Sequence, residues 1–154
     1  MYKNRLIKLK EKNEITQTQI ADILGITRGQ YCHYETEDEI IPLKYLNEIC
    51  NYFNVSIDYI LNFSNKLNYD SNNKEINLII SGNRLKNFRK SLNYTQDKLA
   101  QKLNVARSIV SKYEKGQFLI STHFLYDICK KYHISSDYLL GKIDYEPKLD
   151  NITS

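Results

Sequence analysis

The first half of the chain reappears in the second half, displaced by 79 residues and without a gap. The clearest matches are Asn4-Arg5-Leu6 with Asn83-Arg84-Leu85, Thr16-Gln17 with Thr95-Gln96, Tyr34-Glu35 with Tyr113-Glu114, Cys50 with Cys129, and Ser56-x-Asp58-Tyr59 with Ser135-x-Asp137-Tyr138. An internal repeat of roughly 60 residues predicts two copies of one small domain, because each copy must build its own core. The repeat therefore excludes a single domain formed by all 154 residues.

The repeat divides the chain into a first domain at 1–62, a linker at 63–80, a second domain at 81–142 and a C-terminal tail at 143–154. The linker is rich in asparagine, so we expect its polar part to be mobile, while Leu78-Ile79-Ile80 packs on a domain. A coil of about 18 residues spans roughly 23 Å on average. Fully extended, it reaches about 60 Å.

The two copies carry opposite charge. Residues 1–62 hold 7 Lys and Arg against 9 Asp and Glu, whereas residues 81–142 hold 12 against 4. The net charge of the whole chain, +4, hides this division. Any contact with a polyanion is therefore predicted to fall mainly on the second domain.

Several classes of protein do not fit the composition. The chain has no run of about 18 apolar residues, and its start lacks the apolar stretch of a signal peptide, so we expect a cytoplasmic protein. Cys50 and Cys129 lie in apolar helical patterns and are expected in the cores. The neighbours Cys32 and His33 lack a second pair at ligand spacing, which argues against a metal site. We expect no cofactor and no enzymatic activity, since no phosphate loop or nucleophile with a base partner occurs.

Each copy is predicted to form five short helices, which makes the fold all-α. In the second copy apolar spacing and capping residues predict helices over 81–92, 95–103, 107–115, 121–132 and 135–141, with Ser81, Thr95, Ser121 and Ser135 at their starts. The first copy repeats this order, and Thr16-x-x-Gln19 and Thr27-x-x-Gln30 have the spacing of capping boxes. The second and third helices, joined by a short turn, form a helix-turn-helix.

Both copies resemble the Cro and phage-repressor type of helix-turn-helix domain, also called the xenobiotic-response-element family. The matching residues are Thr95-Gln96-x-x-x-Ala100, Leu103-x-Val105-x-Arg107, Ile109-Val110-Ser111-Lys112-Tyr113-Glu114-x-Gly116 and Ser135-x-Asp137-Tyr138-Leu139-Leu140-Gly141, with their counterparts in the first copy. The resemblance implies two tandem lambda-repressor-like domains. It also implies a sequence-specific regulator of transcription that binds double-stranded DNA, in most cases a repressor.

In this family the third helix lies in the major groove. The resemblance therefore assigns DNA contacts in the second domain to Gln96, Arg107, Ser108, Ser111, Lys112 and Lys115. Without this resemblance, Arg107 and Lys112 would be interpreted as a solvated helix face. A possible second DNA site consists of Gln17, Arg28, Gly29, Cys32 and His33. The resemblance also implies structural ion pairs between Arg89 and Glu114 and between Lys10 and Glu35.

Each copy departs from the family pattern. The first has four carboxylates, Glu35, Glu37, Asp38 and Glu39, at the end of its third helix, which would repel phosphates and impair DNA binding. The second has Ala106 where a capping serine or threonine is expected. It also has Phe118-Leu119-Ile120 in a loop that the family often makes basic, and these side chains either fold back on the bundle or form a contact surface between units.

Two arrangements remain open from the sequence. In one, each domain reads a half-site and the chain is an intrachain pseudo-dimer, which the linker length permits for half-sites about 34 Å apart. In the other, which the charge division favours, the basic domain alone reads DNA as part of a homodimer, and the acidic domain pairs subunits or binds a regulator. A protein-binding module without DNA contact, such as an antitoxin, is the alternative function.

Overall fold

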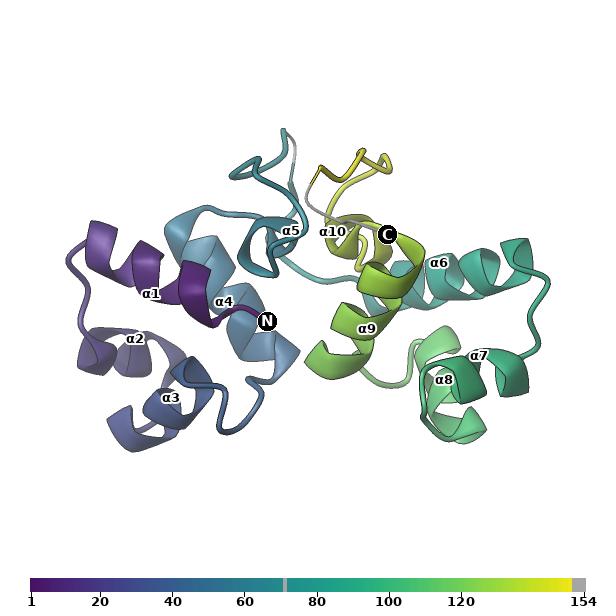
Figure 1. The fold of residues 1–154 in the computed structure, drawn as a ribbon, viewed down its shortest axis with the longest axis horizontal. Helices are drawn as coiled ribbons and strands as arrows, with labels where there is room; N and C mark the ends of the chain where they lie inside the picture. The colour runs from purple at the N-terminus through teal and green to yellow at the C-terminus, as the bar shows by residue number, and fades with distance from the viewer. Residues whose placement is uncertain (71, 151–154) are drawn as a thin grey trace.

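A computed structural model describes residues 1–70 and 72–150, and every regular element within them is helical. The first unit contains α1 (Lys3–Lys12), α2 (Gln17–Leu24), α3 (Arg28–Glu35), α4 (Leu43–Phe53) and α5 (Ile57–Ile60). The second unit repeats this order with α6 (Leu78–Ser91), α7 (Gln96–Lys102), α8 (Arg107–Glu114), α9 (Thr122–Tyr132) and α10 (Ser136–Leu139). Figure 1 shows the two units side by side along the longest axis, with α5 and α10 where they meet. The expected all-α fold of two tandem five-helix units is confirmed.

The helix starts follow the capping residues of the sequence. Thr16 and Gln19 form a complete capping box at α2, in which each side chain bonds the other residue's backbone N–H. At α3, Thr27 accepts from the N–H of Gln30, but the Gln30 amide donates to Glu39 instead of closing the box. The spacing predicted two capping boxes, of which the structure has one complete and one half formed.

The first helix of the second unit begins earlier than expected. Asn77, rather than Ser81, is its N-cap, and the Asn77 Oδ1 atom accepts from the N–H of Ile80 at 2.9 Å. Ser81 is buried inside the helix, at 3% exposure. The prediction of a start at Ser81 was wrong because an equally suitable cap lies four residues upstream, inside the segment assigned to the linker.

Gly82 is required where α6 crosses α8. A Cβ atom at this position would lie 2.5 Å from the Glu114 carbonyl oxygen and 2.7 Å from that of Tyr113. Gly82→Ala is therefore expected to lower the free energy of unfolding by about 1–3 kcal/mol, measured by urea denaturation, because the two helix backbones must separate. The equivalent position in the first unit is Lys3, which is exposed, so Lys3→Ala should change it by less than about 0.5 kcal/mol. Equal losses would contradict this account.

The asparagine-rich segment between the units is not the mobile tether that its composition predicts. The Leu67 carbonyl accepts from the N–H of Ser56 at 2.7 Å, and Tyr69 is 6% exposed. Farther along, the Lys74 carbonyl accepts from the side-chain amides of Asn47 and Asn51, at 3.0 and 2.8 Å. These contacts bond the carbonyls of Leu67 and Lys74 to Ser56, which precedes α5, and to two asparagines of α4. Of the three apolar residues expected to pack, Ile79 and Ile80 lie beside Gly116 and Gly141 but stay 61% and 38% exposed.

Candidate nucleic-acid interface

The two units are joined by a reciprocal exchange of carboxylates between α5 and α10. Asp137 accepts from the backbone N–H groups of Ile57 and Asp58, at 3.1 and 2.7 Å. In return, Asp58 accepts from the N–H of Ser136 at 2.7 Å and from the hydroxyls of Ser135 and Ser136 at 2.5 Å. Both carboxylates are completely buried. Each therefore satisfies the free N–H groups at the helix start of the other unit, where the helix dipole also favours negative charge.

Burial shifts the pKa values of the charged groups at this contact. Burial and the neighbouring charge of Asp58 raise the pKa of Asp137 well above its ordinary value. The nearby Lys142 is also fully buried, and burial lowers the pKa of its ammonium group. Its Nζ atom donates to Asn47 Oδ1 in the other unit at 2.6 Å. Polar groups buried at this depth are costly to separate, so they hold the units in one relative position.

Positions that the repeat makes equivalent form different kinds of interaction across the contact between the units. The 79-residue displacement relates Lys142 to Phe63 and Asn47 to Tyr126. Where Lys142 bonds Asn47, Phe63 stacks on Tyr126 with ring centroids 5.4 Å apart and planes 22° apart. The contact is thus pseudo-symmetric in position but not in chemistry.

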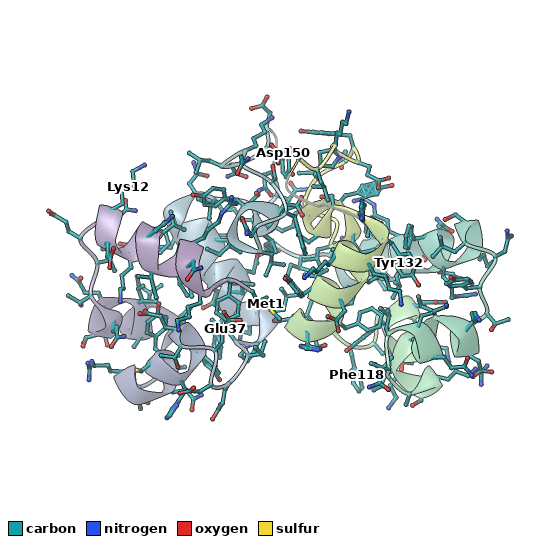
Figure 2. The ribbon with its side chains drawn as sticks, viewed as in Figure 1. Met1, Lys12, Glu37, Phe118, Tyr132 and Asp150 are labelled. Atoms are coloured by element: carbon teal, nitrogen blue, oxygen red, sulfur yellow. The ribbon has the colours of Figure 1, made fainter. Side chains whose placement is uncertain are left out.

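The segment Phe118-Leu119-Ile120 contributes to this contact. Ile120 is 2% exposed, its counterpart Ile41 is fully buried, and the Ile41 carbonyl accepts from Thr122 Oγ1 across the units at 2.6 Å. A groove of about 360 Å³ runs between residues 40–44 and 119–123. This favours the interpretation of a contact surface between units. Phe118 differs, because it remains 51% exposed at the lower edge of the second unit (Figure 2).

The helices α3 and α8 lie on one side of the molecule, at opposite ends of its long axis, along the lower edge in Figure 1. A buried ion pair fastens α8 to α6: Arg89 donates from Nε and Nη2 to the Glu114 carboxylate at 2.7 and 2.9 Å. In the first unit Lys10 donates to Glu35 at 2.8 Å. Burial alone would raise the pKa of Glu35, but hydrogen bonds, chiefly from Lys10, hold it below its ordinary value. Both ion pairs position their helix rather than face solvent.

The residues assigned to DNA contact in the second unit gather at and beside α8. Arg107, Ser108 and Lys115 are exposed, and Ser111 and Lys112 are half-buried. The Arg107 guanidinium lies 3.7 Å from Asp97, with both side chains at least 65% exposed, so this pair is weak. Lys112 Nζ lies 5.0 Å from the centre of the Phe118 ring. Ala106 gives α8 no side-chain cap, and the N–H of Ile109 in the first turn donates to the Ala106 carbonyl at 3.0 Å.

Gln96 and Gln17 have a different position from the one expected. Their side-chain amides donate to the buried glutamates of the ion pairs, Gln96 to Glu114 at 3.1 Å and Gln17 to Glu35 at 3.3 Å. Both glutamines are half-buried, at the first residue of α7 and of α2. In this structure they support the third helix of each unit, so a phosphate contact would have to involve their backbone N–H or a turned side chain.

In the first unit, α3 presents Arg28, Gly29 and His33 to solvent, and Cys32 is half-buried. A Cβ atom added at Gly29 would have no atom within 4 Å apart from the neighbouring backbone of its own helix, so no close packing requires a glycine here. The His33 Nδ1 atom lies 3.6 Å from Asp38, and both side chains are more than half exposed. The candidate second site is therefore accessible, although its groups differ from those of α8.

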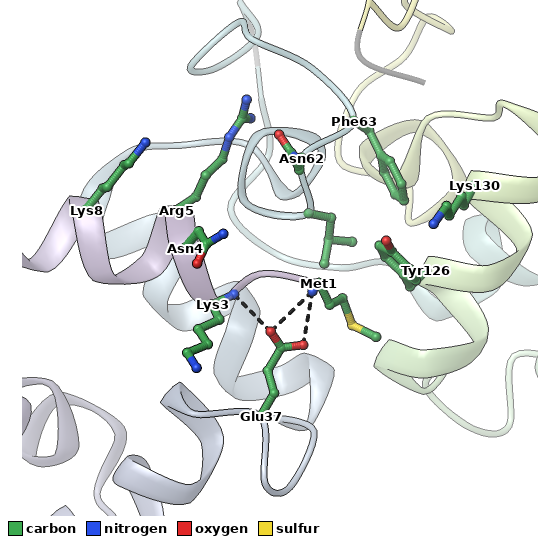
Figure 3. A pocket seen from close by; sticks show the side chains of 11 residues that line it. Met1, Lys3, Asn4, Arg5, Lys8, Glu37, Asn62, Phe63, Tyr126 and Lys130 are labelled. Carbon is green, nitrogen blue, oxygen red and sulfur yellow. Dashed lines mark hydrogen bonds and ion pairs between the residues drawn. The ribbon is translucent and has the colours of Figure 1, made fainter. Parts of the chain in front are cut away.

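The four carboxylates at the end of α3 and directly after it do not act together against a phosphate. Glu35 belongs to the Lys10 ion pair, and Glu37 accepts from the terminal amino group of Met1 and the N–H of Lys3, both at 3.2 Å (Figure 3). This leaves Asp38 and Glu39 exposed. Glu37 lines a pocket of about 670 Å³ that reaches Tyr126 and Lys130 of the second unit. Two of the four charges thus have partners within the fold, while the expected repulsion of phosphates stays a prediction.

Comparison with known proteins gives the same division of the chain. The helix-turn-helix domain family matches residues 4–65 and, a second time, residues 82–144. The chain belongs to this helix-turn-helix family. The doubled match confirms the resemblance inferred from the repeated motifs.

Similar helix-turn-helix proteins occur in Bacillus subtilis. The HTH-type transcriptional regulator ImmR is 39% identical over 67 residues, which are 44% of this chain and 53% of ImmR. The uncharacterized HTH-type transcriptional regulator YobD is 38% identical over 61 residues, 40% of this chain and 54% of YobD. The chain thus spans about half the length of the curated relatives it matches. No solved structure matches it. Among the helices described, none is long and apolar enough to cross a membrane.

One part of the site was missed by reasoning from the sequence. Asp58 and Asp137 were noticed only as members of a repeated motif, and Asn47 and Lys142 were not singled out. A signal was present. Ser56 and Ser135 already cap α5 and α10, so the aspartate at the second position of each helix is not needed as a cap.

Proposed function

We propose that this helix-turn-helix protein is a sequence-specific regulator of transcription, of the repressor type found in phages and mobile elements, that binds double-stranded DNA. The observation that carries the proposal is the placement of α3 and α8 on one side of the molecule, with the first two residues of each helix exposed. A helix enters the major groove by its N-terminal half, and two such helices can occupy successive grooves on one face of a duplex.

The contact between the units supports an intrachain pseudo-dimer. The charge division by itself favours the arrangement in which only the basic domain reads DNA. The buried exchange between Asp58 and Asp137 instead pairs the two units of one chain. The partial compensation of the acidic cluster after α3 removes part of the objection to DNA contact by the first unit. Arg28 is then available for the first half-site.

The repressor type rests on a simpler argument. A protein that occupies an operator can exclude polymerase by position alone, and the described residues form only two helix-turn-helix units and their connections. Curated relatives are named as HTH-type transcriptional regulators, and one of them is described as derived from the SPbeta prophage of Bacillus subtilis.

A second function is favoured by one observation. Phe118 is a large apolar side chain, half exposed, next to the helix that would face DNA. A protein partner that covered Phe118 and α8 would give a protein-binding module, such as an antitoxin, without any DNA contact.

DNA selection with the full chain, followed by gel-shift titration over a range of salt, distinguishes these functions. We expect one enriched sequence, and an affinity whose logarithm falls with the logarithm of salt by about 0.9 for each phosphate contacted. Lys66→Ala/Lys148→Ala is a control that removes two exposed charges from the loop after α5 and the tail after α10, away from α3 and α8 (Figure 1). It should keep the affinity and the slope. The absence of any enriched sequence at low salt would exclude the proposal and favour the protein-binding module.

A further inference from the structure

The pairing surfaces of both units are already used within one chain. Asp58 and Asp137 are fully buried against each other's helices, and Tyr69 of the connecting segment donates to Asp58 at 2.8 Å. A second chain could reach these groups only if the existing contact opened. An ordinary helix-turn-helix dimer consists of two identical chains, whereas here both helix-turn-helix units belong to one chain.

The connecting segment also limits how the two reading helices can move. The N–H of Asn73 donates to the Lys142 carbonyl at 2.7 Å, and the N–H of Asn77 donates to that of Leu140 at 3.2 Å. The same segment bonds Asn47 and Asn51 of α4 through the Lys74 carbonyl. It therefore touches both units. The relation between α3 and α8 is set by buried contacts rather than by the reach of a flexible tether.

The groups that the two reading helices present are unlike. Aligned by the 79-residue displacement, Arg28 matches Arg107, but Gly29, Cys32 and His33 stand against the set Ser108, Ser111 and Lys112. An arginine can form a bidentate pair with guanine, so both half-sites can share one guanine contact. At the other positions α8 offers two hydroxyls and an ammonium group, where α3 offers a thiol, an imidazole and no side chain.

We propose, resting on the proposed function, that a single chain occupies its operator and that this operator consists of two unlike half-sites in fixed order and at fixed spacing. Identical subunits related by a twofold axis require a palindromic operator. Two unlike helices held rigidly in one chain recognise a sequence without that symmetry. The half-site read by α8 supplies most of the affinity because the second unit carries the excess of positive charge.

The proposal is tested on the selected operator by exchange of its halves, with the mass of the complex measured in parallel. We expect a non-palindromic sequence and one chain for each duplex. An operator with the α8 half-site on both sides should bind roughly tenfold or more weakly, since α3 then faces mismatched bases. Insertion of about five base pairs between the halves turns them by half a helical turn and should abolish simultaneous binding.

A matched variant converts one reading helix into the other. Gly29→Ser/Cys32→Ser/His33→Lys gives α3 the four reading residues of α8, since Arg28 already corresponds to Arg107. Selection with this variant should yield a more symmetric operator built from two α8 half-sites. If the wild-type chain selects a palindrome and binds it as two chains, the inference is overturned while the DNA-binding function stands. If nothing is selected, the proposed function itself fails.

Discussion

Replacement of Arg107 and Lys112 together by alanine is expected to reduce specific DNA affinity by roughly 30-fold to 10⁴-fold, which corresponds to about 1–3 kcal/mol for each base-reading side chain. Both residues lie on α8, the more basic of the two reading helices, and neither belongs to a buried network. Their removal takes away two charges and two groups that can pair with guanine acceptors, while the fold should be unaffected. Gel shift at fixed salt measures the loss, and circular dichroism checks the helix content.

Two other variants show whether the loss is specific to α8. Arg28→Ala/His33→Ala removes the equivalent pair from α3 and should also weaken binding, but less, because Asp38 and Glu39 reduce the attraction of that helix for phosphate. The Lys66→Ala/Lys148→Ala control should bind like the wild type. If the α8 variant and this control lose the same affinity, the effect comes from overall charge and α8 is not a reading helix.

Asp58→Ala is expected to lower the free energy of unfolding by about 3–5 kcal/mol, the cost typical of breaking a buried hydrogen-bonded charge network. The substitution removes the acceptor for the N–H and hydroxyl of Ser136, for the hydroxyl of Ser135 and for that of Tyr69. These donors lie where water cannot replace the carboxylate without separating the units. Urea denaturation followed by circular dichroism gives the magnitude.

The same variant also reports on the joint between the units. Because each unit has its own set of five helices, we expect Asp58→Ala to separate the transition into two steps, or to broaden it, as the units lose their coupling. Asp144→Ala removes an exposed carboxylate from the tail after α10 and should leave the midpoint within about 0.5 kcal/mol of the wild type. A change in Asp58→Ala as small as that of this control would show that the carboxylate exchange does not hold the units together.

The helices and most of their starts could be predicted because their causes are local. Thr16, Thr95, Ser121 and Ser135 cap the helices that they were expected to cap, since a capping side chain acts within three residues of its own position. The start of α6 could not be decided in the same way. Asn77 and Ser81 are both suitable caps. In the structure the helix begins after Asn77, and Gly82 within it packs against the backbone of α8.

The contacts of the segment before α6 could not be predicted from its composition. Asparagine and lysine are typical of solvated linkers, and nothing local distinguishes an asparagine in water from one that bonds a distant carbonyl. Asn73 and Asn77 bond the end of the second unit through their backbone N–H groups, and Tyr69 reaches a carboxylate buried between the units. Composition reports the average environment of a residue type, whereas these residues have particular partners.

By itself the sequence determined the two helix-turn-helix units, the order of their helices and the charge inversion between them, because repeat spacing, apolar periodicity and capping all act over a few residues. Only the tertiary structure decided that the units are paired and that α3 and α8 lie on one side. The groups responsible, Asp58 and Asp137, lie 79 residues apart and look like ordinary members of a helix start in either copy. Their role becomes visible when each is seen to satisfy the N–H groups of the other's helix, which is a property of position in space rather than of neighbouring residues.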